Sequence, residues 1–384
     1  MIDFELSEDQ RVLQASVREM CERLIVPNAR RWDEEEKFPH EIVAPLGEMG
    51  LLGMQIPEVY GGAGMKFHDY VIALEEVARA DASIGLTMAS HNSLCTGHIY
   101  LAANEAQKQK YLPRLASGKS LGAWGLTEPG SGSDAGAART RAVRKSGNGG
   151  TSAKWVISGT KTFITQGSVA EIYVILASTS PDKKAKGLTA FIVEKGTPGF
   201  RTGKHIEKMG LHASDTTELV LEEVEVGDEQ RLGEIDQGFF DTLKILDKGR
   251  IGIGAWSIGI GRAAFEAARR YAKERVQFEK PIAEFQAIQH MLADMATELD
   301  AARLLVWRAA WMQDQKRKTT AESSIAKYYA ARATMRACNA VVQIHGGYGY
   351  TREFDVERYL RDAKLAEIGE GTNEVQKMVI ARAA

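Results

Sequence analysis

A single carboxylate between two glycines is the first feature of this chain that suits chemistry. In the segment AEIGEGTNE, residues 366–374, Glu370 lies between Gly369 and Gly371. Glycine permits unusual backbone angles and the close approach of another molecule, so the triplet suits a general base whose substrate lies against the backbone. Gly-x-Gly is equally typical of a plain turn. The triplet alone leaves both interpretations open.

Two further glycine-rich segments carry groups suited to holding a ligand. WGLTEPGSGSDAG, residues 124–136, combines an aromatic residue, hydroxyls and glycines, so backbone N–H groups, Thr127 and Ser133 could meet a planar, hydrogen-bonding ligand. A hairpin explains the same residues. QIHGGYGY, residues 343–350, ends a long helical stretch with paired glycines, which by itself is an ordinary helix C-cap.

The sequence does not support a dinucleotide-binding, metal-binding or nucleophile motif. GIGRAA, 259–264, matches G-x-G-x-x-A, but its flanks predict one continuous helix, where small residues let helices approach closely. The eight histidines include no HExxH pattern, and His91 and His98 are better explained as packing or capping residues than as a metal pair. No GxSxG sequence indicates a nucleophile elbow. We therefore predict no metal site.

The elements that must position these segments fall into three parts. A capping-box pattern at Ser7 and Gln10 opens a first third whose apolar residues recur at helical spacing. Four short β-rich runs then follow, KWVISGTK (154–161), EIYVILAST (171–179), GLTAFIVE (187–194) and TELVLEEVEV (217–226), and after them helical periodicity returns in long stretches typical of a bundle. We predict an α+β multidomain chain with an N-terminal helical domain over 1–120, a middle β domain over 121–235 and a C-terminal helical bundle over 236–384.

Composition narrows the class of protein. At 384 residues the chain is long enough for two or three packed units, and its net charge of −2 argues against nucleic-acid binding. Three scattered cysteines indicate neither a disulfide framework nor a zinc site. The acidic start MIDFELSEDQ lacks signal-peptide and transit-peptide features, and the longest uncharged run, 251–261, is too short for a transmembrane segment. We expect a cytoplasmic protein, or a mitochondrial matrix protein if this is a mature eukaryotic chain.

Taken together, several segments resemble the acyl-CoA dehydrogenase family of flavoproteins over essentially the whole chain. They are TEPGSGSD, the SDT at 214–216, LDKGRIGI, ERVQF at 274–278, QIHGGYGY, and RDAK followed by EIGEGTNEVQ. The resemblance implies FAD as cofactor and α,β-dehydrogenation of an acyl-CoA to the trans-2-enoyl-CoA. It also implies an electron-transferring flavoprotein as electron acceptor and a homotetramer.

The resemblance also implies roles for individual residues. Glu370 matches the catalytic base, while Gly249, where a few relatives place the base instead, cannot act. The backbone N–H of Glu370, together with a flavin ribityl hydroxyl, would polarise the thioester carbonyl. Ser133, Asp247, Arg250 and Gly371 match substrate contacts. The residues that match cofactor contacts are Trp124, Leu126, Thr127, Gly132, Ser133, Phe163, Thr165, Arg275, Phe278, Gln286, Gln343, Gly346, Gly347, Thr372 and Glu374.

Some of these matches carry further expectations. The set from Arg275 to Gly347 resembles residues that reach the FAD of a neighbouring subunit, and Phe163 stands where the family more often has Trp. Gly369 stands where many relatives have Tyr, which favours a short or short-branched acyl chain. Gly85 matches the position of an Arg in relatives that act on glutaryl-type substrates. The alternatives are a flavin oxidase or monooxygenase on the same fold, or a non-catalytic acyl-CoA- or flavin-binding protein.

Overall fold

The N-terminal part of the chain is helical, as predicted. The computed structural model describes residues 5–145 and 153–383, so part of the acidic N-terminal stretch lies outside the described residues. The Ser7 hydroxyl accepts from the Gln10 amide (3.2 Å) and the Gln10 side chain accepts from the Ser7 amide (3.1 Å), which confirms the capping box. The helices are α1 (Glu8–Leu24), α2 (Ala29–Glu35), α3 (Val43–Glu48), α4 (Phe67–Ala80), α5 (Ala82–Ala89), a π-helical segment (Ser90–Thr96), α6 (Gly97–Ala102) and α7 (Glu105–Ala116).

One eight-stranded sheet forms the middle of the chain. Its main path runs β6-β7-β3-β2-β4-β5-β8, and β1 pairs in parallel with β4. The strands are β1 (Gly122–Gly125), β2 (Arg141–Lys145), β3 (Lys154–Thr165), β4 (Ile172–Ser178), β5 (Leu188–Glu194), β6 (Phe200–His205), β7 (Thr216–Gly227) and β8 (Arg231–Leu232). The four β-rich runs singled out in the sequence are therefore strands, while the exact domain boundaries stay predictions.

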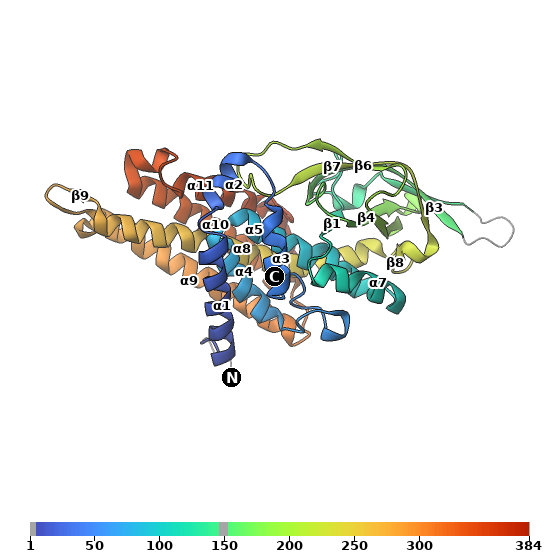
Figure 1. Ribbon diagram of the computed structural model, residues 1–384, viewed down its shortest axis with the longest axis horizontal. Coiled ribbons are helices and arrows are strands. Elements are labelled where there is room, and N and C mark those ends of the chain that lie inside the picture. Colours follow the sequence, from blue (N-terminus) through green and yellow to red (C-terminus); the bar gives the residue numbers. More distant parts are fainter. Residues whose placement is uncertain (1–4, 146–152, 384) are drawn as a thin grey trace.

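Long helices return after the sheet. They are α8 (Gly238–Glu274), α9 (Gln286–Asp314), α10 (Thr320–His345), α11 (Val356–Ala363) and α12 (Asn373–Ala383), and a small hairpin of β9 (Val276–Gln277) and β10 (Lys280–Pro281) joins α8 to α9. Figure 1 shows the sheet at one end of the longest axis and the β9 hairpin at the other, with the helices between them. Among the described residues, no helix is both long and apolar enough to cross a membrane.

The glycines of α8 let neighbouring helices come close. A Cβ on Gly259 would lie 2.7 Å from the Ala78 Cβ of α4, and one on Gly261 would press on Leu299 of α9. GIGRAA therefore lies inside a continuous helix, and the prediction that its small residues serve helix packing is confirmed.

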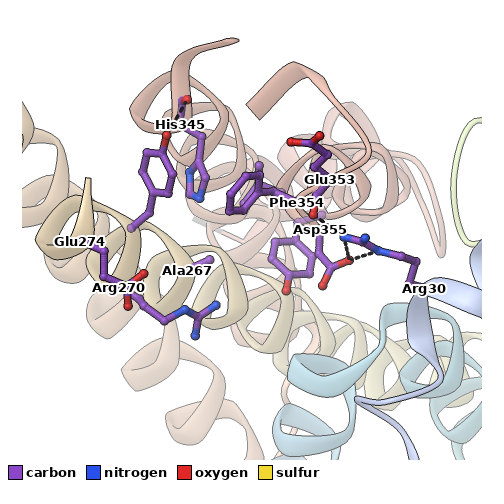
Figure 2. A pocket seen from close by; sticks show the side chains of 11 residues that line it. Arg30, Ala267, Arg270, Glu274, His345, Glu353, Phe354 and Asp355 are labelled. Atoms are coloured by element: carbon purple, nitrogen blue, oxygen red, sulfur yellow. Dashed lines mark hydrogen bonds and ion pairs between the residues drawn. The ribbon is translucent and has the colours of Figure 1, made fainter. Parts of the chain in front are cut away.

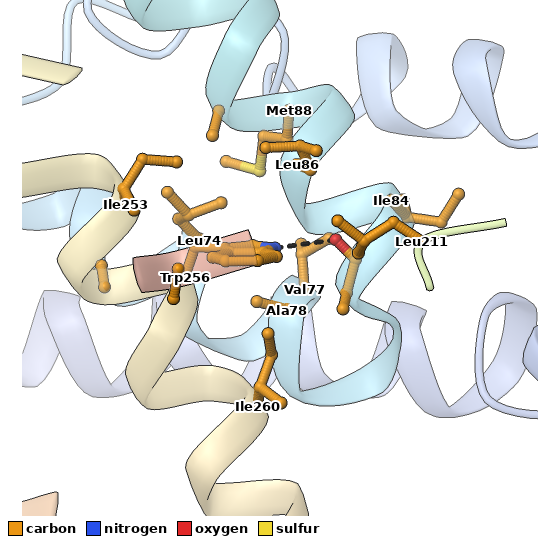
Figure 3. Close-up of a cluster of buried hydrophobic side chains, with 14 of the residues drawn as sticks. Leu74, Val77, Ala78, Ile84, Leu86, Met88, Leu211, Ile253, Trp256 and Ile260 are labelled. Atoms are coloured by element: carbon orange, nitrogen blue, oxygen red, sulfur yellow. Dashed lines mark hydrogen bonds between the residues drawn. The ribbon is translucent and has the colours of Figure 1, made fainter. Parts of the chain in front are cut away.

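A buried tryptophan fixes α8 against α4 and α5. The Trp256 indole donates to the Ala82 carbonyl at 2.7 Å and is completely buried. Figure 3 shows Leu74 and Val77 beside it from α4, with Ile253 and Ile260 above and below it on α8. Because packed interiors resist displacement, this cluster holds the α8 backbone in place beside the candidate site.

His91 and His98 are packing residues, as predicted. The Gly122 amide donates to His91 Nδ1 (3.1 Å), and the Trp124 indole donates to His98 Nδ1 (3.1 Å). Burial lowers the pKa of each imidazole to about 4, so both are neutral. The described residues contain no group of three or more potential metal ligands placed to hold an ion.

Candidate active site

Glu370 lies in a short loop whose backbone is held in an unusual conformation. Glu370 has φ of 51° and Gly371 has φ of 95°, so both adopt the left-handed region. That region is unfavourable for residues with a side chain, and a surrounding structure must enforce it. Gly371 needs to be glycine for this reason. Gly369 does not, because a Cβ there would meet Leu365 at an ordinary 3.4–3.7 Å.

Two buried donors hold the loop. Lys327 Nζ of α10 donates to the Gly371 carbonyl at 2.8 Å, and Gln376 Nε2 donates to the same oxygen at 2.9 Å. Gln376 also reaches the Glu370 carbonyl at 3.4 Å. Side chains from the first turn of α12 and the first half of α10 therefore hold the loop that carries Glu370.

The Glu370 carboxylate is poised to exchange a proton. Its Oε2 atom is inaccessible to solvent and has no hydrogen-bond partner among the described residues. Burial raises the pKa of Glu370 to about 7, against the opposing charges of Lys327 and Arg250. The carboxylate lies over Gly249 of α8, where any Cβ would overlap Oε2. The two positions at which the family is expected to place its base therefore adjoin in this fold.

Asp247 and Arg250 lie on α8, and the charge of Arg250 acts on Glu370. Arg250 Nη1 donates to Asp247 Oδ1 (2.9 Å), and the Thr320 hydroxyl donates to Asp247 Oδ2 (2.6 Å). The Arg250 Nε atom is buried and makes no hydrogen bond to any described residue. These two predicted substrate residues pair with each other, which leaves an unused guanidinium donor beside the carboxylate.

The predicted cofactor loop after β1 begins with a tight turn and continues with exposed residues. Glu128 and Ser131 exchange backbone hydrogen bonds of 3.0 Å, so the hairpin interpretation and the ligand interpretation are compatible. Beyond the turn Ser133 is exposed, and a Cβ on Gly132 would meet nothing within 4 Å. Trp124 and Leu126 are buried, and the Trp124 indole is engaged by His98, so these two residues offer backbone groups rather than side chains.

A buried ion pair between Lys161 and Glu128 holds this loop against β3. Lys161 Nζ of β3 lies 2.7 Å from Glu128 Oε1 and 3.1 Å from the Leu126 carbonyl. Burial lowers the pKa of Lys161 to about 8, against the attraction of Glu128. Breaking a buried pair leaves one charge uncompensated. The pair therefore anchors the segment that contains Thr127.

Phe163 projects from the same region into solvent. Its side chain is 65% exposed and its φ is 57°, next to a register shift between Lys161 and Ile164 in the pairing of β3 with β7. The Thr162 amide donates to the Thr127 carbonyl (2.9 Å), which brings Phe163 and the half-buried Thr165 beside the loop. Strained residues and bulges concentrate at functional sites. An exposed aromatic ring here fits contact with a planar ligand.

A second group of predicted cofactor residues lies at the far end of the molecule. Phe278, 87% exposed with φ of 52°, forms the tip of the β9 hairpin between the exposed Arg275 and Gln286. The Arg275 guanidinium lies 5.6 Å from the Tyr348 ring centre, which links the hairpin to the turn after α10. The exposed Gln343 lies in the last turn of α10, and the exposed Gly346 and Gly347 follow it in the turn, where a Cβ on either glycine would meet nothing within 4 Å.

The fold does not bring the two groups together within one chain. Figure 1 places the sheet that carries Phe163 and the β9 hairpin that carries Phe278 at opposite ends. Thr372 and Glu374 belong to neither group, because both lie at the start of α12. The Thr372 hydroxyl accepts from the Val375 amide (3.3 Å), and Glu374 is exposed.

A pocket lined partly by aromatic residues lies at the end of α10, next to Gly346 and Gly347. Tyr271 stacks on His345 with ring centres 4.0 Å apart, and Phe354 packs edge-on against both. Figure 2 shows Arg30 and Arg270 at its sides, with Arg30 bonded to Asp355. Arg30 also donates to the Glu353 carbonyl at 2.7 Å. The stacked rings fix the end of α10 from which Gly346 and Gly347 project.

Sequence reasoning missed three groups near the site: Lys327, Lys161 and Tyr70. Lys327 and Lys161 are completely buried, and the hydroxyl of Tyr70 is a buried oxygen 3.3 Å from the Cβ position of Gly252. Lys327 lies in an otherwise apolar stretch of helix with Ala326, Ala330 and Ala331. A charged residue among these apolar positions could have indicated a functional role for Lys327. Tyr70 had none, because a tyrosine on an amphipathic helix is an ordinary core residue.

The chain is similar to known proteins over almost its whole length. Three family models match in order: acyl-CoA dehydrogenase N-terminal domain over residues 7–119, middle domain over 123–224 and C-terminal domain over 236–384. The short-chain specific acyl-CoA dehydrogenase of Clostridium acetobutylicum is 44% identical over 379 residues, covering 99% of this chain and 98% of that protein.

Two solved structures have closely similar folds. Butyryl-CoA dehydrogenase from Megasphaera elsdenii superposes with a TM-score of 0.96 at 41% identity, over 100% of this chain and 99% of that one. A chain from the structure described as "Electron transferring flavoprotein of Acidaminococcus fermentans: Towards a mechanism of flavin-based electron bifurcation" has a TM-score of 0.96 at 42% identity, with the same coverage.

Proposed function

The chain belongs to the acyl-CoA dehydrogenase family, and from this premise we propose that it oxidises a short acyl-CoA to the trans-2-enoyl-CoA with FAD as cofactor. The short-chain specific relative and the butyryl-CoA dehydrogenase structure support the substrate class. The observation that carries the proposal is the buried, unpaired Oε2 of Glu370.

Glu370 takes the α-proton of the thioester. A carboxylate with the usual pKa near 4.3 is a weak base, whereas a pKa of about 7 brings proton affinity close to what neutral pH requires of a general base. As the C–H bond breaks, its electron pair forms the Cα–Cβ double bond. The unpaired Oε2 receives the proton without first losing a hydrogen bond.

The Glu370 amide stabilises the charge that develops on the thioester oxygen. In the described part of the chain this N–H makes no hydrogen bond, so it can donate to a bound thioester oxygen. An amide donor preorganised for developing negative charge contributes about 10² to 10³ in rate. The same residue thus supplies the base and one oxyanion donor.

The two groups of exposed residues, one near Phe163 and one near Phe278, are suited to binding FAD. They offer exposed aromatic side chains at Phe163 and Phe278 and uncovered glycine backbone at Gly132, Gly346 and Gly347. When bound, FAD accepts the hydrogen of the β-carbon as hydride. Thr127, Phe163 and Thr165 would hold its ring system, and Arg275, Gln286 and Gln343 would hold the remainder.

Because the two groups lie at opposite ends of one chain (Figure 1), we infer that a complete cofactor site uses two copies of the chain. A homotetramer provides such sites in pairs. Light scattering of the purified protein checks this: a monomer that retains flavin at full occupancy would contradict it.

Electrons leave the reduced enzyme to an electron-transferring flavoprotein. The similarity to a chain from a structure described by that partner's name supports this step. The bacterial relatives support a cytoplasmic location, which stays a prediction.

Anaerobic mixing with butyryl-CoA tests the proposal. Loss of oxidised-flavin absorbance is expected for the wild type, and Glu370→Gln should slow it by at least about 100-fold while acyl-CoA still binds, since a positioned general base contributes 10² to 10⁴. Glu367→Gln is a matched control, because Glu367 is a neighbouring carboxylate that pairs with Lys364 at 2.6 Å. Reduction of Glu370→Gln at nearly the wild-type rate would assign the base elsewhere.

A further inference from the structure

Lys327 is a buried cation without a carboxylate partner. The side chain is 0% exposed, and its Nζ donates to the Gly371 carbonyl at 2.8 Å. Within the described ranges, no Asp or Glu lies at ion-pair distance from it. Buried lysines are rare and are normally paired, because removing the charge from water is unfavourable. Its retention beside the Glu370 loop therefore needs an explanation.

The hydrogen bond from Lys327 acts on the Gly371–Thr372 peptide, in the loop that carries Glu370. The Gly371 carbonyl accepts from Lys327 on one side and from Gln376 on the other. Fixing this carbonyl holds the Gly371–Thr372 peptide, and Gln376 also reaches the Glu370 carbonyl at 3.4 Å, so the two side chains restrain the loop in which Glu370 has a φ of 51°. A residue in that region returns to a commoner conformation when its constraints are removed. Lys327 is one of the two side chains that supply the constraint.

The charge of Lys327 also acts on the carboxylate. The groups that bear on Glu370 come from three helices: Tyr70 from α4, Arg250 from α8 and Lys327 from α10. Arg250 is already neutralised by Asp247 at 2.9 Å. Glu367 and Glu374 act on Lys327 from the loop and from α12, but neither pairs with it. Lys327 is therefore the uncompensated positive charge beside Glu370.

The titration of both groups agrees with this geometry. Burial raises the pKa of Glu370, and Lys327 is the largest effect opposing that rise. Burial lowers the pKa of Lys327 to about 8, and Glu370 is the largest effect opposing that fall. Each charge thus favours the ionised form of the other.

We propose that Lys327 is a positioning residue for the dehydrogenation, which holds the Gly371 carbonyl and with it the loop that carries Glu370, and which places an unpaired positive charge beside the Glu370 carboxylate. The inference rests on the proposed function, since it assigns Lys327 a role toward the base of that reaction. Lys327 itself takes no proton from the substrate.

The test measures the rate of anaerobic flavin reduction by butyryl-CoA between pH 5.5 and 9. In the wild type the rate should rise with pH as Glu370 ionises. Lys327→Met removes the charge and the donor at similar length, so the midpoint should move up by about one pH unit and the rate below the midpoint should fall about tenfold. Binding of crotonyl-CoA should change little. Lys327→Arg should keep the wild-type midpoint, because it restores the charge.

The controls separate positioning from general damage. Lys204→Met removes an exposed lysine of β6 and should leave the profile unchanged. If Lys327→Met does not retain flavin, Lys327→Gln carries the same test with a polar neutral side chain. A merely structural role lowers the active fraction but leaves the midpoint in place, and an unmoved midpoint in the neutral variants would overturn the inference. A wild type that butyryl-CoA does not reduce would instead count against the proposed function.

Discussion

Replacing Glu370 by Gln should stabilise the folded protein at pH 8 and much less at pH 5. The pKa of this carboxyl is raised from 4.5 to about 7 in the folded chain, chiefly by burial. At low pH the acid is protonated in both states and the pKa difference has no effect. As pH rises from 4.5 through 7, the unfolded chain gains the charge more easily than the folded one, so stability is lost. Gln has no such loss, because it stays neutral.

The size of the effect follows from the two pKa values. They differ by about 2.5, and each pKa unit corresponds to 1.36 kcal/mol, so the full stabilisation at pH 8 is about 3 kcal/mol. A chain of 384 residues has an unfolding entropy of about 0.8 kcal/mol per kelvin. The expected rise in Tm is therefore about 4 °C at pH 8 and about 1 °C at pH 5.

Thermal unfolding with excess FAD at both pH values gives the measurement. Glu367→Gln, a neighbouring and partly exposed carboxyl, is the control and should show no such pH-dependent gain. Repeating the scans at two FAD concentrations separates cofactor binding from the carboxyl's own contribution. A Glu370→Gln protein that is equally or less stable than wild type at pH 8 would refute the assignment of a buried, raised-pKa carboxyl.

Three further outcomes follow from the walls of the site. Gly369→Tyr should lower kcat/KM for isovaleryl-CoA more than for butyryl-CoA, because a Cβ there meets only Leu365 at ordinary contact and the added ring fills the space beyond it; equal losses would place the space for a branch elsewhere. Glutaryl-CoA should be turned over more slowly than butyryl-CoA, because a side chain at Gly85 would collide with Ala78 and Trp256 and no cation can stand there; a steady-state comparison of the two substrates decides it. Tyr70→Ala should raise the ratio of hexanoyl-CoA to butyryl-CoA activity at least about fivefold by removing a fully buried ring beside Gly252, whereas Tyr70→Phe should leave that ratio within about twofold; a Tyr70→Ala enzyme with the wild-type chain-length profile would contradict this.

Local signals predicted most of the elements. The Ser7–Gln10 capping box, the strand run at 188–194 and the continuous helix through GIGRAA are all present, because capping and periodicity depend on residues a few positions apart. The helical spacing predicted for the first third was less reliable over residues 41–53. Only α3 (Val43–Glu48) forms an α-helix there, since Gly50 adopts φ of 71° and turns the chain.

The amino-acid sequence alone identified the order of the segments, the family resemblance and Glu370 as the candidate base. The order of the segments follows from residue type and spacing, whereas the role of Glu370 followed from the family resemblance. Tertiary structure decided the rest. Glu370 acquires its raised pKa from burial among α4, α8 and α10, the loop acquires its shape from Lys327 and Gln376, and Gly249 lies under the carboxylate because α8 passes there. Desolvation, Coulomb interactions and steric overlap depend on distances between atoms that are remote in the sequence, and only the folded chain sets those distances.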